Sequence, residues 1–581
     1  MTLSSPARSL NHLGIIIISL ISTLAYFPRM RIGMSTLDDG FYAYAAEAIL
    51  EGKLIHRDFF SQYLGYQHYI HASFFWLFGS DYVVLRYWLI VVQFACAYFS
   101  ALIFRSKGWQ FQIMAALAVT GFGIVLFNNP STGWTCVGLT LAIIYSISSE
   151  EGRPQNYARL VTTGVLLGVM AGIRHPTAIF VGMAVLVHVI INSKTAKDVK
   201  QSNSIASRSA ITLLLLVAAT SLLIYMRAAS TFLDLLPWFI APFSYLGYTL
   251  LQLRHINCAA ALKKLFLVLA GFLLAIAPVI ALTTVNNSWS ATFVDLMTLP
   301  SNYSSMLGLT TFDVAGNMIF TARESLNFLN AVGLVIALIA LFFPMTTAFA
   351  MWIGSKRPVL RAWIESPLTI FAAFHALVIV ALISTIYSAY ILPLEILSLI
   401  YLISISPKGW WGKAVLTAIS TMALISTAFI YPEINTKANF SFFGGSRIKS
   451  LSDCWLPRCS LKISSGNARI SSAAYKAVEQ VKRPNSTVIV LPWGYHYEFS
   501  YPAQNRPAYP DYRIPLYRGV PADIAYKELM KAQDPVILIA KPSMRDESTY
   551  REFEEFFARD FYKSYDSPIY MVLIKKHRAV N

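Results

Sequence analysis

Two adjacent carboxylates, Asp38 and Asp39, open the polar segment LDDGFYAYAAEAILEGKLIHRDFF at residues 37–60. The segment separates an apolar run at residues 13–27 from a second one that starts near Tyr82. A carboxylate within hydrogen-bond reach of a hydroxyl group can accept its proton while the oxygen forms a new bond. Aspartate is also a good helix N-cap, and one carboxylate can cap a helix while the other acts. The pair is therefore a candidate for general-base chemistry as well as for capping.

Basic side chains that could bind an anion follow these carboxylates or interrupt the apolar runs. They are Lys53, His56 and Arg57 after the acidic segment, Arg86 about one turn inside the second apolar run, and Arg174 with His175 in the short connection GIRHPT. Ionisable groups at membrane depth are costly and usually functional, although long side chains can also extend to lipid headgroups. We favour Arg86 and Arg174, because each is flanked by apolar sequence that offers few polar partners.

The residues after the acidic pair predict a short helix that begins at Asp38 and ends at Glu51, where Gly52 supplies a stop. Four apolar residues fall at helical spacing on one face: Phe41, Ala45, Ala48 and Ile49. A short helix beside a membrane span is expected to lie along the bilayer surface, with this stripe facing lipid or neighbouring spans. Such a helix would hold both carboxylates near the interface between membrane and water.

The composition indicates a membrane protein, since 56% of the 581 residues are hydrophobic and only 13% are charged, against about 25% charged in an average soluble domain. Apolar runs near the length of a membrane span, about 20 residues, predict roughly 13 spans, with an uncertainty of one or two. Their starts lie near Leu13, Tyr82, Phe111, Thr132, Leu160, Pro176, Ala210, Leu235, Leu265, Leu326, Pro367, Tyr390 and Ala414. We expect the first span to be retained as an anchor, because FPRMRIG follows it where a signal peptide would carry small residues.

The basic residues between the spans predict the orientation, because cytoplasmic loops are enriched in Lys and Arg. With a cytoplasmic N-terminus, 17 basic residues fall in cytoplasmic loops and seven in the opposite loops. The net charge of +17 is therefore explained by topology, and we expect no nucleic-acid partner. An odd number of spans places the acidic segment and the C-terminal region together on the non-cytoplasmic side, which we expect to be the outer side of a bacterial cell membrane.

The chain divides near residue 432. Residues 1–431 form the expected transmembrane domain, with long outer loops at 28–81 and 286–324, each of which could be a substrate wall or a plain connector. In residues 432–581, helical patterns alternate with the strands TVIVL, VILIA and IYMVLI, which predicts a small non-cytoplasmic α/β domain with a largely parallel sheet. The fold class is thus a polytopic α-helical membrane protein with a small α/β domain.

The five cysteines do not indicate a disulfide scaffold. Cys96, Cys136 and Cys258 lie in or beside apolar segments and are expected to be small packing residues. Cys454 and Cys459, in DCWLPRCS, form a plausible local disulfide if that region faces an oxidising compartment.

The order of these features resembles the GT-C superfamily of integral-membrane glycosyltransferases, and most closely the branch of the protein O-mannosyltransferases and the lipid A aminoarabinose transferase. The resemblance rests on the first-loop motif DDGFYAYAAEAILEGKL with RDFF, the segment YQHYIHASFFWLFG, the span with Arg86, and the C-terminal stretch VIVLPWGYHYEFSYPAQNRPAY. The middle of the chain matches only in hydropathy.

This resemblance implies transfer of a hexose or pentose from a polyprenyl-phosphate donor to a lipid, glycan or protein acceptor on the non-cytoplasmic face. Asp38 matches the first acidic residue of the family motif, the candidate base, and Asp39 replaces a residue that is commonly Glu. Glu47 is a weaker candidate that could equally be a surface residue. Some members hold a divalent metal ion through the acidic residue, so a divalent ion is an open candidate, and no other cofactor is assigned.

One departure from the family concerns the phosphate. Many relatives carry a Lys-Pro-Pro-like element after the helix, whereas this chain has SQYLGYQHY without lysine, which leaves His68 or Gln62 as substitutes. His496 and Glu498 have the types of metal ligands, but a surface pair two residues apart is the simpler interpretation without a third ligand.

Two further functions remain open. A transporter or flippase of lipid-linked sugars would be expected to show inverted repeats and broken helices with sites at mid-membrane, and neither a repeat nor a mid-span acidic site is evident. A non-catalytic scaffold would make the acidic pair dispensable.

Overall fold

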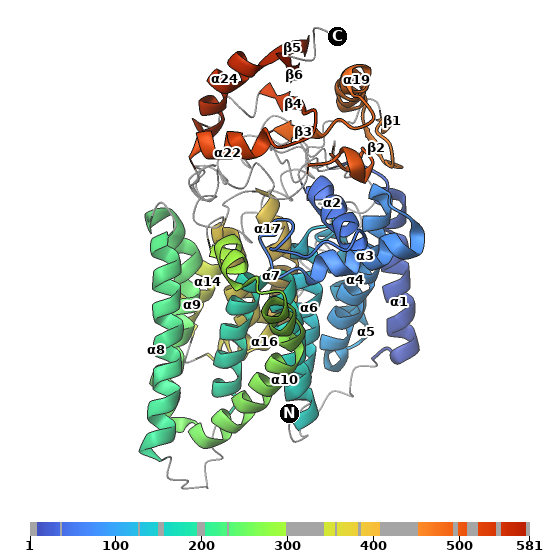
Figure 1. The fold of residues 1–581 in the computed structure, drawn as a ribbon. Helices are drawn as coiled ribbons and strands as arrows, with labels where there is room; N and C mark the ends of the chain where they lie inside the picture. The colour runs from blue at the N-terminus through green and yellow to red at the C-terminus, as the bar shows by residue number, and fades with distance from the viewer. Residues whose placement is uncertain are drawn as a thin grey trace.

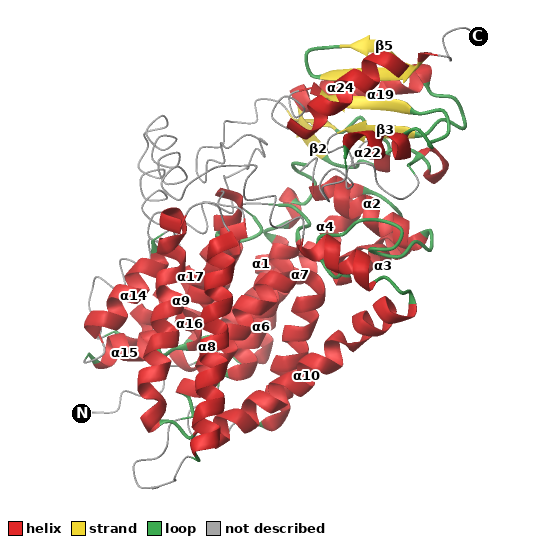
Figure 2. Ribbon diagram, turned by 60° about the vertical axis from the view of Figure 1, so that its left-hand side comes forward, coloured by secondary structure: helices red, strands yellow, loops and turns green. Residues whose placement is uncertain are grey.

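The computed structural model describes residues 9–34, 38–125, 128–148, 156–193, 204–228, 232–297, 342–354, 357–381, 385–406, 451–491, 498–507, 521–541 and 548–576. A helical bundle forms one end of the molecule and a smaller domain with a sheet forms the other (Figures 1 and 2). The bundle contains α1 (His12–Leu24), α2 (Asp38–Leu50), α3 (Tyr66–Phe78), α4 (Tyr82–Ile103), α5 (Trp109–Gly121), α6 (Thr132–Ile147), α7 (Tyr157–Ile191), α8 (Ile205–Ala228), α9 (Phe232–Gln252), α10 (Cys258–Val285), α14 (Phe343–Gly354), α15 (Pro358–Ile364), α16 (Pro367–His375) and α17 (Thr385–Ile405).

Within the described ranges, five helical segments are long and apolar enough to cross a membrane, and a sixth is added if the bent pair α15 and α16 counts as one span. The five segments are His12–Arg29, α4, α7, Ile205–Met226 within α8, and α10. Three further apolar helices are shorter. The polytopic helical architecture is therefore present, but the predicted count of 13 spans is not confirmed. The spans expected from Leu326 and Ala414 begin outside the described residues.

Helix α7 consists of two helices joined at Arg174, where the backbone leaves the helical region with φ −153° and ψ 90°. Pro176, two residues later, has no N–H to donate and its ring clashes with the preceding turn. A Cβ on Gly182 would lie 3.5 Å from Leu167 Cδ2, although 15 residues of straight helix extend about 22 Å. The two halves are therefore folded against each other, as the separate starts predicted at Leu160 and Pro176 require.

Glycines bring the first half of α7 close to α10. A Cβ on Gly164 would lie 1.9 Å from the carbonyl oxygen of Val268, and one on Gly168 would lie 2.6 Å from that of Phe272. Small residues four positions apart allow helix backbones to approach this closely in a membrane. The contact fixes α7 relative to α10, and with it the bend at Arg174.

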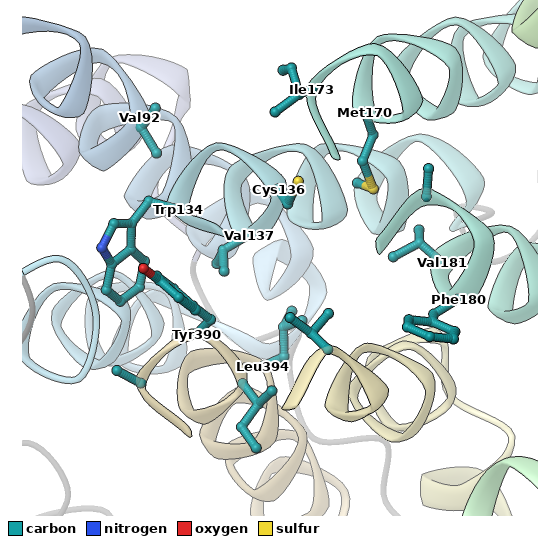
Figure 3. Close-up of a cluster of buried hydrophobic side chains, with 14 of the residues drawn as sticks. Val92, Trp134, Cys136, Val137, Met170, Ile173, Phe180, Val181, Tyr390 and Leu394 are labelled. Carbon is teal, nitrogen blue, oxygen red and sulfur yellow. The ribbon is translucent and has the colours of Figure 1, made fainter. Parts of the chain in front are cut away.

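Buried apolar side chains from α4, α6, α7 and α17 form the centre of the bundle (Figure 3). Trp134 of α6 packs edge-to-face on Tyr390 of α17, with 4.8 Å between the ring centroids. Cys136 lies in the same cluster, and Cys96 and Cys258 are also buried free thiols, as expected for packing residues. This core holds the ends of α6 and α17 beside α2.

Helix α2 begins at Asp38 as predicted and ends at Leu50, just before Gly52, which has φ +81°. Packing of the apolar stripe on neighbouring helices was one of the two predicted alternatives, but the expectation that only this face is covered is wrong. Residues 39–46 are all buried, so both faces of the helix are covered. Helices α3 and α4 pack on α2, and the C-terminal domain covers its remaining side through ion pairs to Glu47. A helix enclosed on all sides shows little apolar asymmetry.

The C-terminal domain contains a two-stranded sheet, β1 (Leu451–Asp453) with β2 (Lys462–Ser464), and a four-stranded sheet in the order β3-β4-β6-β5. Its strands are β3 (Val488–Leu491), β4 (Val536–Ala540), β5 (Phe561–Asp566) and β6 (Tyr570–Lys575), with helices α19 (Ser465–Val481), α22 (Ala522–Leu529) and α24 (Ser548–Asp560). Only the β3–β4 pair is parallel, so the prediction of a largely parallel sheet is wrong. The sheet is mixed because β5 and β6 are consecutive antiparallel neighbours.

Backbone hydrogen bonds join this domain to the segment between α1 and α2. The N–H of Lys462 in β2 donates to the carbonyl oxygen of Arg31 over 2.6 Å, and the N–H of Gly33 donates back to the carbonyl of Lys462 over 2.9 Å. The beginning and the end of the chain are therefore directly hydrogen bonded beside α2.

Candidate active site

Asp39 is neutralised inside the protein. Its Oδ2 accepts a hydrogen bond of 2.8 Å from Nη2 of Arg86, and both side chains have 0% exposure. The same guanidinium donates to the carbonyl oxygen of Gly33 at 3.4 Å. A buried ion pair of this kind compensates two charges that would be costly alone. Arg86, a predicted phosphate ligand, is thus engaged with Asp39 and fixes the beginning of α2.

Asp38 differs from its neighbour because its side chain is only half-buried. Its Oδ2 accepts a hydrogen bond of 2.5 Å from Nδ2 of Asn129, in the connection between α5 and α6. The side-chain Oδ1 of Asn129 in turn accepts a hydrogen bond of 3.2 Å from the Tyr390 hydroxyl. The adjacent Asn128 donates to the carbonyls of Arg29 (2.7 Å) and Ile32 (3.2 Å). Asn128 therefore holds the backbone at residues 29–32, and Asn129 orients the Asp38 carboxylate.

Aromatic and polar side chains of α2 and α3 form a wall beside Asp38. The Tyr42 ring lies 5.3 Å from His71 and 5.6 Å from His68, between centroids, and its hydroxyl accepts a hydrogen bond from the Thr132 N–H. Burial, and then the nearby Tyr63 and Asp38, raise the pKa of the Tyr42 phenol well above its ordinary value. Tyr42 therefore stays neutral, within electrostatic reach of both Asp38 and Tyr63.

His68 cannot replace the missing lysine as a positive charge. Burial, and then the neighbouring His56, lower the pKa of its imidazole from 6.5 to about 3. Its Nε2 lies 3.1 Å from the hydroxyl oxygen of Ser61. His68 is thus neutral near pH 7 and contributes hydrogen bonding and packing.

Arg174 lies at the bend of α7, directed toward the same wall. Its guanidinium carbon is 5.8 Å from the centroid of Tyr63, and the ring of His175 is 6.5 Å from the Tyr63 ring. Arg174 is buried. Tyr63 is thus a neighbour of Arg174 and, like Asp38, acts electrostatically on Tyr42.

The remaining predicted cations bind local or loop carboxylates. Lys53 pairs with Glu51 over 3.0 Å, and the exposed Arg57 pairs with Asp58 over 2.6 Å. His56, whose φ is +66°, places Nδ1 2.9 Å from Oδ2 of Asp295 and so connects the segment at residues 28–81 with the segment that begins at residue 286. Of the second loop, residues 298–324 lie outside the described ranges.

No group of three or more His, Cys, Asp and Glu residues among the described positions is arranged to hold a metal ion. His496 lies outside those positions, and Glu498 is a buried residue whose Oε1 accepts a hydrogen bond of 3.1 Å from the Val490 N–H, not a surface residue as expected. Cys454 and Cys459 form a disulfide.

Four contributing residues were not identified from the sequence: Asn129, Tyr390, Arg458 and Arg506. The two asparagines in FNNPST were a signal for the first, since an amide between two apolar helices needs partners. Glu47, a weaker candidate, binds both Arg458 and Arg506.

No family model and no curated protein matches the chain. Among solved structures, it is similar to ArnT from Cupriavidus metallidurans bound to undecaprenyl phosphate, with a TM-score of 0.38 and 11% identity over 96% of this chain and 97% of that one. It is also similar to the Archaeoglobus fulgidus oligosaccharyltransferase in complex with Zn and sulfate, with a TM-score of 0.41 and 11% identity over 97% and 73%. The same enzyme tethered to an acceptor peptide containing the NVT sequon gives a TM-score of 0.46 and 11% identity, over 97% and 74%. Likenesses of this size carry no functional conclusion, which has to come from the site itself.

Proposed function

We propose that the protein is a glycosyltransferase that moves a hexose or pentose from a polyprenyl-phosphate donor to a hydroxyl-bearing lipid, glycan or protein on the non-cytoplasmic face of the membrane. The observation that carries the proposal is the division of roles between the two carboxylates. Asp39 is fully buried on Arg86, whereas Asp38 is half-buried and oriented by Asn129. A base needs an accessible, directed carboxylate, and only Asp38 of the pair combines both properties.

In the proposed reaction, the acceptor hydroxyl oxygen forms a bond to the anomeric carbon while the bond from that carbon to the phosphate oxygen breaks. Asp38 accepts the hydroxyl proton, and the polyprenyl phosphate leaves with the bonding electrons. The guanidinium of Arg174 is the candidate to stabilise the leaving phosphate, because a cation at low dielectric interacts strongly with developing negative charge. His175 and His56 lie near this position, whereas Lys53 and Arg57 are paired with Glu51 and Asp58.

A divalent ion, if one is bound, would supply further positive charge for the phosphate, and Asp38 is the accessible carboxylate that could hold it. From the sequence we expect membrane lipids to surround the bundle, and we expect no nucleic-acid partner. The same prediction places both the site and the C-terminal domain outside the cytoplasm.

The test uses purified protein in lipid nanodiscs with a panel of undecaprenyl-phosphate mannose, glucose, galactose and arabinose. A bacterial membrane lipid extract serves as the acceptor source. Mass spectrometry measures released undecaprenyl phosphate and glycosylated lipid. We expect at least one donor to be consumed and Asp38→Asn to lower turnover by about 10²–10⁴-fold, the contribution of a general base. Asn129→Ala is expected to give a smaller loss.

The matched control is Asp523→Asn, the same substitution at an exposed aspartate of α22, which is expected to leave turnover unchanged. Full activity of Asp38→Asn would refute the assignment of the base. Movement of an intact donor across the bilayer of liposomes containing the protein, with no donor consumed in either assay, would instead support a flippase.

A further inference from the structure

Glu47 of α2 is held by two arginines from the C-terminal domain. Its Oε1 lies 2.5 Å from Nη1 of Arg458, and its Oε2 lies 2.5 Å from Nη2 of Arg506. Nη1 of Arg506 also lies 3.4 Å from Oε1 of Glu51, one turn further along the helix. Both carboxylate oxygens of Glu47 are therefore engaged, on the side of α2 that the membrane helices leave uncovered. We call Glu47, Arg458 and Arg506 the clamp.

The arginines of the clamp are themselves fixed from behind. Arg506 donates from Nε (2.9 Å) and Nη2 (2.8 Å) to the carbonyl oxygen of Tyr501, and its side chain is only 2% exposed. Arg458 donates to the same carbonyl over 3.0 Å and to that of Phe499. The Phe499 ring lies under the Arg458 guanidinium at 4.2 Å and packs against Tyr82 of α4 at 4.8 Å between centroids. Charge-assisted hydrogen bonds of this kind are about twice as strong as neutral ones, and partial burial reduces the screening that weakens exposed ion pairs.

The Cys454–Cys459 disulfide closes the loop that carries Arg458. Arg458 adopts a φ of +59°, which is unfavourable for a residue with a Cβ, and its carbonyl oxygen accepts the N–H of Tyr82 over 3.1 Å. The same loop contacts α4 again through the Ser460 hydroxyl, which donates to Asp81 over 2.7 Å. The disulfide and these contacts thus hold the loop in place, so that Arg458 has a fixed position beside Glu47.

Helix α2 is consequently held at two positions. Near its N-terminus, Asp39 binds Arg86 and Asp38 binds Asn129; nine residues later, about 13.5 Å along the axis, Glu47 is in the clamp. Without the clamp, only the polar contacts of the first turn and the packing of α3 and α4 would orient α2, and a small rotation or tilt of the helix would redirect the Asp38 carboxylate. A shift of about 1 Å in a reacting group can lower a rate by about a hundredfold.

We infer that Arg458 and Arg506 are positioning residues, which act through Glu47 to orient the Asp38 carboxylate. The loop closed by Cys454 and Cys459 contributes to this positioning because it carries Arg458. The inference rests on the proposed function. It makes the C-terminal domain a component of the transfer site and not a separate binding module, and it makes turnover sensitive to thiol reductants.

The experiment compares Arg506→Gln, Glu47→Gln and their double variant in the undecaprenyl-phosphate-sugar assay, using the donor that the wild type consumes. We expect kcat per folded protein to fall about ten- to a hundredfold, while KM and the affinity for added undecaprenyl phosphate change less than about threefold. The double variant should lose less activity than the product of the two single losses, because both substitutions remove the contact between Glu47 and Arg506. Arg506→Lys should retain part of the activity, because lysine keeps the positive charge but lacks the planar guanidinium that contacts Glu47 and Glu51 through separate nitrogens.

Glu528→Gln, which removes a half-buried carboxylate paired with the exposed Lys531 on the same domain, is the matched control and should leave kcat unchanged. Unchanged kcat in the clamp variants, or equal losses in kcat and in the affinity for undecaprenyl phosphate, would overturn the inference. The first of these outcomes together with an inactive Asp38→Asn would leave the proposed function standing. A wild type that consumes no donor, or an active Asp38→Asn, would count against the proposed function instead.

A second measurement does not depend on folding of the variants. Dithiothreitol is added to folded wild-type protein, and thiol labelling verifies reduction of Cys454 and Cys459. We expect kcat to fall and to recover on reoxidation, with no such response in the Cys454→Ser/Cys459→Ser variant. If the disulfide is reduced and kcat does not change, the disulfide does not contribute to the positioning of Asp38. If the clamp variants also failed to fold, a purely structural role would replace the inference.

Discussion

Removal of Arg86 offers a sharp test of how the candidate site is built. The Arg86→Leu substitution removes the positive charge but keeps an apolar side chain at this position of α4. It leaves the carboxylate of Asp39 buried without the guanidinium that now lies 2.8 Å away. Because both side chains have 0% exposure, water does not screen or replace the lost interaction in the folded protein.

The size of the effect follows from this burial. Breaking a buried ion pair by removing one partner costs about 3–5 kcal/mol, whereas replacing both partners by apolar residues is often nearly neutral. We therefore expect Arg86→Leu to lower the free energy of unfolding by about 3–5 kcal/mol. The double variant Asp39→Leu/Arg86→Leu should recover most of that loss.

The assay is reversible unfolding in mixed micelles of mild detergent and increasing sodium dodecyl sulfate, followed by tryptophan fluorescence. Lys531→Met, which removes the 68% exposed partner of Glu528, is the control and should show no measurable change. A double variant less stable than Arg86→Leu, or an Arg86→Leu protein as stable as the wild type, would refute the assignment of Asp39 and Arg86 as a structural pair.

Two further predictions concern stability. Gly168→Val should greatly reduce the yield of folded protein in size-exclusion chromatography, because a Cβ at this position would lie 2.6 Å from the Phe272 carbonyl oxygen. The control Gly247→Ala should not reduce the yield, because the space around Gly247 is open. Equal yields of the two variants would contradict the close packing of α7 on α10. The folded protein binds a proton at His68 only near pH 3, but the unfolded chain binds it near 6.5. Stability should therefore decrease as pH falls below about 6.5, and less steeply in His68→Gln; parallel thermal-shift curves from pH 7.5 to 5 would argue against it.

Local signals were sufficient for the helix that carries the carboxylates and for the bend at Arg174. Gly52 marks the end of α2 because its φ of +81° is accessible to glycine. Pro176 breaks the helix in GIRHPT for the steric reasons that the sequence already contains. The preference for Asp38 over Asp39 as the accessible carboxylate agrees with their burial, although the catalytic role itself stays a prediction.

Contacts between distant segments could not be derived from local patterns. The partner of Asp38 is 91 residues away, and the partner of Glu47 at Arg506 is 459 residues away. Periodicity shows that a helix has an apolar face, but not which segments cover its polar one. The stripe on α2 was therefore left open between lipid and neighbouring spans, and the clamp was missed.

The error in the C-terminal sheet has a different cause. Strand β5, FYKSYD, pairs on one side only and lies at the end of the order β3-β4-β6-β5. Edge strands carry polar and charged residues that prevent further pairing. Such a strand lacks the β-branched run that identified β3, β4 and β6, so its antiparallel partnership with β6 left no clear signal.

The separation of Glu47 from its partners has a consequence for the order of events during synthesis. Arg458 is added 411 residues after Glu47, and a ribosome adds about 5–20 residues per second. Helix α2 therefore waits roughly 20–80 s before the segment that completes its surroundings exists. During that interval the side of α2 that carries Glu47 is uncovered, and this surface is available to chaperones, proteases or a neighbouring nascent chain.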